Sequence, residues 1–186
     1  MDARAGGEQM KKNVLIIAGS PRREGNSDLL CEAFAQGARE AGHSVEMVTL
    51  RSLHIAPCQA CYGCRASQVC VQKDDMETLL SRMLACDVLV LATPVYFYSM
   101  SAQMKAMIDR TLPVYAQMRG KELYFIATAA ASRKAMERTM DALQGFADCL
   151  PQAVVRARIC GEGVYQKGEV RATEAMAQAL AAGQNC

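Results

Sequence analysis

The sequence predicts a doubly wound α/β fold, in which a parallel sheet of five strands lies between two layers of helices. Short apolar runs rich in β-branched residues alternate along the chain with longer segments whose apolar residues recur at helical spacing. Strands that alternate with helices form right-handed βαβ units, which build a parallel sheet. The expected strands are 14–17, 44–50, 87–92, 123–127 and 153–160.

The first strand is followed by a turn and the start of a helix. Residues 14–17 form a continuous apolar run, typical of a central strand covered on both faces. Gly19 and Gly25 interrupt the run, and Asn26 and Ser27 are good N-caps for the helix that follows. The first turn of a helix presents unpaired N–H groups and the positive end of its dipole. We therefore expect an anion there, most often a phosphate.

The turn carries neither of two common phosphate motifs. A P-loop needs Gly, four residues, then Gly-Lys-Ser/Thr, but Gly19 and Gly25 are one step too far apart and Asn26 replaces the lysine. The dinucleotide fingerprint G-x-G-x-x-G is also absent. The remaining donors suit one terminal phosphate, and an ordinary turn before a well-capped helix is the alternative. The expected phosphate ligands are Ser20, Arg22, Gly25, Asn26 and Ser27.

The later elements continue the alternation. Residues 87–92 and 123–127 are apolar enough for buried strands, whereas 153–160 is more polar and favours a sheet edge. The intervening segments carry methionines at helical spacing, which is typical of a core, and a last helix is expected from about Thr173. Five such strands fit the order 2-1-3-4-5, with a ligand at the switch point between strands one and three.

An aromatic-rich loop follows the third strand. Pro94 ends that strand because it has no N–H for the ladder. Ligands of open α/β sheets bind at the carboxyl ends of strands, so this loop can form a wall for a flat ring. A hydrophobic loop that packs on a neighbour is the alternative. Small residues after the fourth strand allow close approach, and the expected ring-binding residues are Pro94, Val95, Tyr96, Phe97, Thr128 and Ala129.

One connection, residues 51–73, is far longer than the usual βα loop of about 2–6 residues. It carries four cysteines in the spacing C-x2-C-x2-C-x5-C, namely Cys58, Cys61, Cys64 and Cys70. Two-residue gaps let successive thiolates surround one small object, as in ferredoxins that bind a 4Fe–4S cluster. Free thiols, a redox disulfide and zinc are the alternatives, although structural zinc prefers two knuckles set farther apart.

These motifs resemble those of the flavodoxin-like, NAD(P)H-dependent FMN reductase family, and within it those of the iron–sulfur flavoprotein branch. The resemblance rests on GSPRREGNS at 19–27, the cysteine loop, TPVYFYSMSAQMKAMIDR at 93–110 and ICGEGVYQKGEV at 159–170. It covers nearly everything from Lys12 onward. The resemblance implies bound FMN lined by residues 94–97, NAD(P)H as electron donor, and a homodimer or homotetramer that covers the flavin.

Three hypotheses follow. The first is an FMN enzyme that passes electrons from NAD(P)H to a small-molecule or protein acceptor. The second is an electron-transfer protein that holds FMN and a 4Fe–4S cluster, and the third is a non-catalytic module with zinc in the cysteine loop. No catalytic side chain is expected in the first two, because a flavin supplies its own redox chemistry.

The composition excludes several other classes. The net charge is +2 and no basic run interleaves with aromatic residues, so nucleic acid is not an expected partner. No apolar stretch is long enough to span a membrane. Nine cysteines without a secretory signal indicate a reducing, cytoplasmic compartment. Residues 1–11 are expected to be a disordered lead-in, and residues 12–186 a single domain.

The remaining polar residues and cysteines are expected to be structural. Asp74 and Asp75 fit a helix cap and a first-turn acid, and the two histidines fit solvated turns. Lys105, Asp109 and Arg110 fit a structural ion pair beside the site. The cysteines expected in the core are Cys31, Cys86, Cys149 and Cys160.

Overall fold

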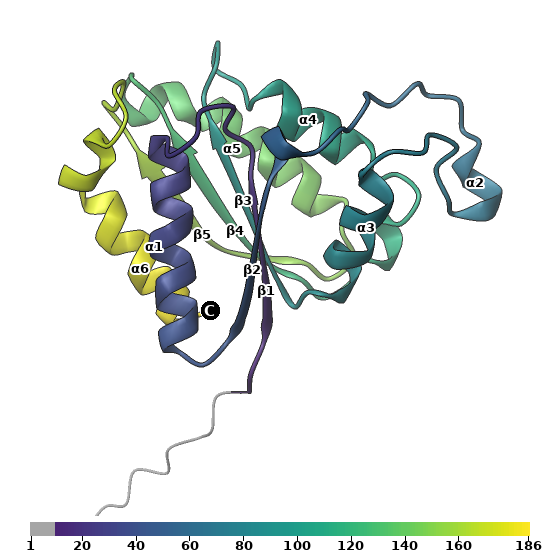
Figure 1. The fold of residues 1–186 in the computed structure, drawn as a ribbon, viewed down its shortest axis with the longest axis horizontal. Coiled ribbons are helices and arrows are strands. Elements are labelled where there is room, and N and C mark those ends of the chain that lie inside the picture. The colour runs from purple at the N-terminus through teal and green to yellow at the C-terminus, as the bar shows by residue number, and fades with distance from the viewer. Residues whose placement is uncertain (1–9) are drawn as a thin grey trace, which may run out of the picture.

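The computed structural model describes residues 10–186, which form a five-stranded sheet between two layers of helices (Figure 1). All neighbouring strands pair in parallel, in the order β2-β1-β3-β4-β5. The predicted fold class and strand order are therefore confirmed. The strands are β1 (Asn13–Ala18), β2 (Ser44–Thr49), β3 (Val88–Pro94), β4 (Glu122–Thr128) and β5 (Val154–Gly161).

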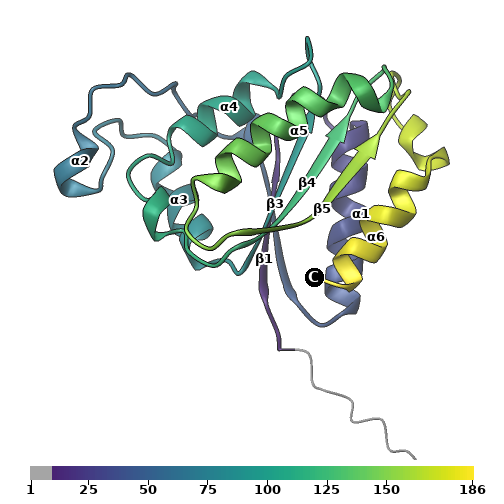
Figure 2. The same cartoon turned by 180° about the vertical axis from the view of Figure 1, so that it is seen from behind.

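Helices cover both faces of the sheet, as Figures 1 and 2 show. One face carries α1 (Asn26–Glu40) and α6 (Glu174–Gln184). The other carries α3 (Met76–Ala85), α4 (Ala102–Asp109) and α5 (Arg133–Asp148). The short helices are η1 (Leu50–Ser52), α2 (Cys64–Ser67), η2 (Tyr115–Gln117) and η3 (Glu169–Ala172).

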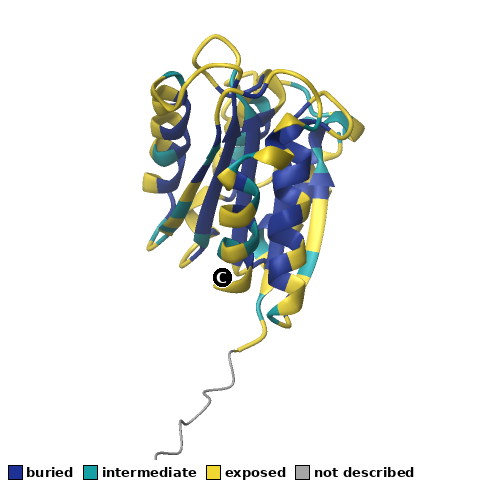
Figure 3. Cartoon of the chain, turned by 90° about the vertical axis from the view of Figure 1, so that its left-hand side faces the viewer, coloured by how far each residue is buried: buried dark blue, intermediate teal, exposed yellow. Residues whose placement is uncertain are grey.

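Each face of the sheet has its own apolar core, because successive strand residues point to opposite faces. Ile16 and Val90 pack with Leu30 and Phe34 on the α1 side. Buried positions run along the central strands, whereas the outer strands carry exposed positions (Figure 3). The polar strand β5 is therefore at an edge, as predicted. The predicted methionine stripes lie largely in the core opposite α1, including Met76, Met83, Met104, Met107, Met136 and Met140.

The division into a lead-in at 1–11 and a domain at 12–186 stays a prediction, and residues 1–9 lie outside the described part of the chain. No helix in the described part is long and apolar enough to cross a membrane.

One of the four cysteines expected in the core lies elsewhere. Cys31 and Cys86 are buried and Cys160 is partly buried against the core, but Cys149 is exposed. Cys149 follows the last turn of α5 as its C-cap, where the chain reaches the surface. A helical position predicted from spacing alone does not reveal that the helix has already ended.

His43 is buried, so the prediction of a solvated turn was wrong for it. The backbone N–H of Lys12 donates to its Nδ1 at 3.2 Å, and its Nε2 lies 2.9 Å from the carbonyl oxygen of Cys186. The turn between α1 and β2 is therefore covered by the two ends of the described chain, which sequence periodicity cannot anticipate.

Two glycines bring α1 and α6 into backbone contact. A Cβ added to Gly37 would lie 2.1 Å from the carbonyl oxygen of Leu180. A Cβ added to Gly183 would lie 2.1 Å from the carbonyl oxygen of Phe34. Neither position can carry a side chain unless the helices separate, so this contact fixes the distance between α1 and α6.

We expect Gly37→Ala to lower the free energy of unfolding by about 1–3 kcal/mol, because overpacking forces the two helices apart. Urea denaturation measures this change. Gly145→Ala is the matched control, since Gly145 is at an exposed position of α5 with no atom within 4 Å of the added Cβ. That variant should gain roughly 0.5–1 kcal/mol from helix propensity. Equal stability of the two variants would contradict the close contact.

Candidate functional site

A pocket lies at the carboxyl end of the sheet, at the switch point where β1 adjoins β3. It is lined by all of the predicted phosphate and ring residues except Phe97. Ala130, Val164 and Tyr165 complete its wall. The loops after β1, β3 and β4 thus meet around one cavity, because parallel strands end at the same edge of the sheet.

The helix after β1 begins one residue earlier than expected. Gly25 is the N-cap of α1, and no side chain caps the helix. The prediction of Asn26 and Ser27 as caps was therefore wrong, and both lie inside the first turn. The N–H groups of that turn have no intrahelical acceptor. An anion in the pocket can accept from them and benefits from the helix dipole.

The hydroxyl of Ser27 is the observation that indicates a ligand-binding position most directly. Ser27 is 1% exposed and lines the pocket, yet its Oγ has no hydrogen-bond partner. A buried hydroxyl without a partner is costly, and such groups are rare in folded proteins. A ligand oxygen on the first turn of α1 would satisfy it. Ser20 adds a second hydroxyl, which accepts a hydrogen bond from the N–H of Arg22 at 3.1 Å.

Asn26 holds a distant loop in place. Its Nδ2 donates to the carbonyl of Gln166 at 2.8 Å, and its Oδ1 accepts the N–H of Gly168 at 3.0 Å. The side chain therefore positions the loop after β5, which carries Tyr165 into the pocket wall. Arg22 also contacts Tyr165, because its Nη1 donates to that residue's carbonyl oxygen at 3.0 Å.

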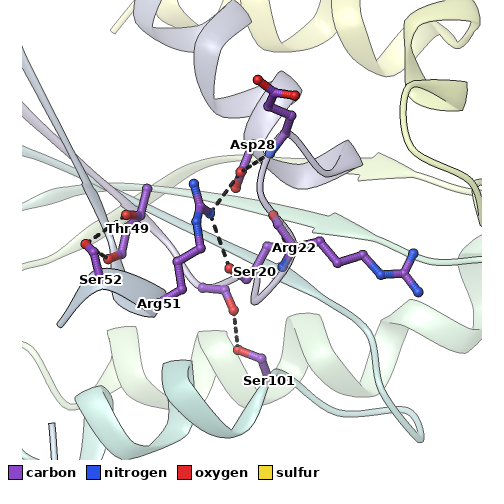
Figure 4. A network of polar contacts seen from close by, with 9 residues as sticks. Ser20, Arg22, Asp28, Thr49, Arg51, Ser52 and Ser101 are labelled. Atoms are coloured by element: carbon purple, nitrogen blue, oxygen red, sulfur yellow. Dashed lines mark hydrogen bonds and ion pairs between the residues drawn. The ribbon is translucent and has the colours of Figure 1, made fainter. Parts of the chain in front are cut away.

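Asp28 and Arg51 form a polar network beneath the turn (Figure 4). Asp28 is buried in the first turn of α1, where its Oδ2 accepts Arg51 Nη1 at 2.9 Å. Arg51 Nη1 also donates to the carbonyl oxygen of Ser20 at 3.3 Å. Burial raises the pKa of Asp28 above its ordinary value, although Arg51 acts in the opposite direction. No local spacing predicts this pair, because Asp28 lies in α1 and Arg51 lies 23 residues away in η1.

Ser101 fixes the same turn from the α4 side (Figure 4). Its Oγ donates to the carbonyl oxygen of Gly19 at 2.7 Å and caps α4 by accepting the N–H of Met104 at 3.2 Å. Its own N–H donates to Thr93 Oγ1 at 2.9 Å. The end of β1, the end of β3 and the start of α4 are thus tied together around one buried serine.

The loop after β3 is a tight hairpin. Tyr96 and Ser99 exchange both backbone hydrogen bonds, at 2.9 and 3.0 Å. Phe97 and Tyr98 occupy the turn with φ of 48° and 63°, a region that costs energy for residues other than glycine. Tyr96 lines the pocket, but the reversal leaves Phe97 at the tip with its side chain fully exposed. Within this chain, Phe97 does not reach the cavity it was predicted to line.

A second pocket lies among the cysteines of the 51–73 loop, which projects beyond α3 in Figures 1 and 2. Cys58, Cys61, Cys64 and Cys70 all line it, and none is in a disulfide. In the described part of the chain, no three His, Cys, Asp or Glu residues converge to hold a single metal ion. The two pockets have no lining residue in common.

A buried ion pair fastens the cysteine loop to the end of α4. Arg110 is 1% exposed, and its Nη1 and Nη2 donate to the two oxygens of Asp74 at 2.7 and 2.9 Å. Nη1 also donates to the carbonyl oxygen of Ala56 at 2.7 Å, while the N–H of Ala56 donates to Asp74 at 3.0 Å. The pair therefore attaches both ends of the loop, at Ala56 and at Asp74, to the end of α4.

The pKa values of this pair follow its contacts. Burial raises the pKa of Asp74, but the hydrogen bonds from Arg110, Ala56 and Met76 bring it below its ordinary value. Burial lowers the pKa of Arg110, but Asp74 and then the Cys70 thiol raise it overall. The N-cap of α3 is Asp75, one residue later than the predicted cap, and Asp75 makes no side-chain cap hydrogen bond. Asp74 instead accepts the N–H of Met76, the first residue of α3, at 3.1 Å.

The predicted ion pair beside the site is only partly correct. Lys105 and Asp109 pair on the surface at 2.5 Å, where such contacts contribute little to stability. Arg110 does not join them but turns inward to Asp74. The partners are 36 residues apart, so no local spacing identified them.

Comparisons with known proteins agree with this geometry. A model of the NADPH-dependent FMN reductase family matches residues 12–162. The chain is 33% identical over 135 residues to an iron–sulfur flavoprotein of Methanocaldococcus jannaschii, a match that covers 72% of this chain and 70% of that protein. It is 38% identical over 96 residues to an iron–sulfur flavoprotein of Methanosarcina thermophila, covering 52% and 50%. The chain therefore spans about half the length of that second relative.

The fold also matches solved structures. An NAD(P)H:quinone oxidoreductase from Methanothermobacter marburgensis superimposes with a TM-score of 0.75 at 22% identity, over 95% of this chain and 96% of that one. At this identity the likeness concerns the fold.

Proposed function

The chain belongs to the NADPH-dependent FMN reductase family, and from this premise we propose that its pocket at β1 and β3 binds FMN, with the phosphate on the first turn of α1. The protein is an FMN-dependent oxidoreductase that uses NAD(P)H. The observation that carries the assignment of the phosphate site is the buried, unpartnered hydroxyl of Ser27 beside open helix N–H groups. Its donor set suits a phosphate monoester, which is the anionic end of FMN.

The pocket residues divide into two groups under this proposal. Ser20, Ser27 and the N–H groups from Gly25 onward donate to the phosphate, and Arg22 supplies a positive charge nearby. Pro94, Val95 and Tyr96 form the wall for the ring. Thr128 and Ala129 leave room for its approach, and Asn26 keeps the loop with Tyr165 closed over the cavity.

The chain's own residues bind and orient in this mechanism. When bound, the flavin supplies the hydride and electron chemistry. Among the described residues that line the pocket, none is a carboxylate, a histidine, a lysine or a cysteine. Under this proposal no side chain acts as a general acid or base, because the flavin supplies the redox chemistry. The chain would instead hold the phosphate, and Val95 and Val164 would line one side of the ring.

Ser27→Ala removes one hydrogen bond to a charged phosphate, which is worth about 1.5–3 kcal/mol. We expect FMN affinity to fall about 10- to 150-fold, and Ser20→Ala to act in the same direction. Fluorescence titration of FMN measures the loss. The control is Ser81→Ala, because Ser81 is exposed on α3 and bonds only to Glu77 of its own helix. Unchanged affinity in both pocket variants would mean that the phosphate binds elsewhere.

For the second pocket we propose a 4Fe–4S cluster held by Cys58, Cys61, Cys64 and Cys70. One observation supports it: all four cysteines line one cavity. A cluster of this type is held by four thiolates around one space. Such a cluster would supply single-electron chemistry, so transfer to a partner protein is the second candidate function.

If one cluster has four ligands, Cys58→Ala, Cys61→Ala, Cys64→Ala and Cys70→Ala should each lose the same iron and keep FMN, because the two pockets are separate. Iron and flavin analysis of anaerobically reconstituted protein measures both. Cys149→Ala is the exposed control and Cys86→Ala the buried one, and both should keep their iron. Wild-type protein that binds no iron would exclude the cluster.

We further propose that the protein acts as a homodimer or homotetramer in a reducing compartment such as the cytoplasm. The exposed aromatic tip at Phe97, beside the pocket-lining Tyr96, supports a partner subunit that covers the flavin. The nine cysteines of a sequence without a secretory signal support reducing conditions. The acceptor is a small molecule or a redox protein. Light scattering of FMN-loaded protein should give a multiple of the chain mass, and a strict monomer would contradict this proposal.

A further inference from the structure

We propose that Arg110 is a positioning residue that raises the reduction potential of the cluster, by holding a buried cation against the cysteine pocket beside Cys70. This inference rests on the proposed cluster. It concerns a side chain outside the cysteine motif, contributed by the end of α4 and not by the loop itself.

Arg110 belongs to the wall of the pocket that the four cysteines line. It is also among the largest fully buried side chains of the described chain. Its Nη atoms bond to Asp74 and Ala56, but its Nε is buried and has no partner. A buried N–H without an acceptor is costly. Cys70 lines the same cavity as Arg110, so a sulfur ligand or the cluster itself can accept from the guanidinium.

The positive and the negative member of the buried ion pair are placed differently with respect to the pocket. Arg110 lines the cavity, whereas its partner Asp74 does not. The cation of this pair therefore borders the cavity that the cysteines line, and the anion does not. The other charged residue in the described wall, Asp109, pairs with Lys105 at the surface, where solvent screens both. Arg110 thus supplies the buried charge that a cluster in this pocket would meet.

A nearby cation and a hydrogen-bond donor to sulfur both raise the reduction potential of a cluster. Reduction adds negative charge to the cluster, and positive charge or hydrogen bonds at its sulfurs stabilise that state. The reduction potential therefore rises. Asp74 has the opposite effect on the potential, because its charge offsets the guanidinium. Yet both residues fasten the same loop through Ala56, so they share one structural role.

This contrast separates tuning of the potential from simple tethering of the loop. Arg110→Met removes the cation, whereas Asp74→Asn keeps it and removes the opposing charge. Arg110→Lys keeps a charge but loses the planar fork that reaches two partners. A residue that only tethers the loop would lower iron occupancy in every variant, and any drift of the potential would have the same sign.

The experiment reconstitutes the cluster anaerobically in wild type, Arg110→Met, Arg110→Lys and Asp74→Asn. It measures iron, sulfide and FMN per chain, and then the midpoint potential by redox titration followed by EPR. We expect a more negative potential in Arg110→Met, a smaller negative shift in Arg110→Lys, and a positive shift in Asp74→Asn. If Arg110→Met does not fold, the opposite signs for Arg110→Lys and Asp74→Asn decide the question.

The proposal is overturned if loaded arginine variants keep the wild-type potential, or if they shift in the same direction as Asp74→Asn. A wild type that takes up FMN but no iron overturns the cluster and this inference together. That result differs from a loaded wild type whose variants are unchanged, so the two failures can be told apart.

Discussion

The parallel pairing of β1 with β3 is the constraint on which the rest of the site depends. Ala18 faces Ala92 in the register, and the N–H of Gly19 donates to the carbonyl of Ala92 at 2.7 Å. β1 therefore ends opposite Ala92, and β3 continues only as far as Pro94, which brings the turn before α1 beside the hairpin after β3. A Cβ on Gly19 would lie 3.1 Å from that same carbonyl oxygen, so the close approach leaves little room for a side chain.

Helix α4 connects the two candidate cofactor pockets. Its cap, Ser101, fixes the turn of the first pocket, and Arg110, directly after its last residue, forms part of the second. The helix has 8 residues and is therefore about 12 Å long. Its core side, with Met104 and Met107 fully buried, holds it rigidly against the sheet. One short helix thus sets the relative position of the phosphate turn and the cysteine loop.

The sequence predicted what depends on local pattern. Apolar runs located the central strands, and alternating or more polar segments located the outer ones. The positions of Ser20, Ser27, Pro94 and Tyr96 after strands located the pocket, because parallel topology gathers strand ends. Interactions between distant segments could not be predicted from the sequence. Asp28 and Arg51 are 23 residues apart in the sequence. The loop that Asn26 holds is more than a hundred residues from Asn26. The turn that exposes Phe97 depends on backbone angles that composition does not encode.

The central claim is that one chain holds a flavin and a cluster in separate pockets. The most direct measurement is the visible spectrum of anaerobically purified protein, combined with iron and acid-labile sulfide analysis. We predict flavin absorption together with about four iron and four sulfide per chain. Protein that shows the flavin alone would contradict the claim for the second pocket, and colourless protein that takes up no FMN would contradict it for both.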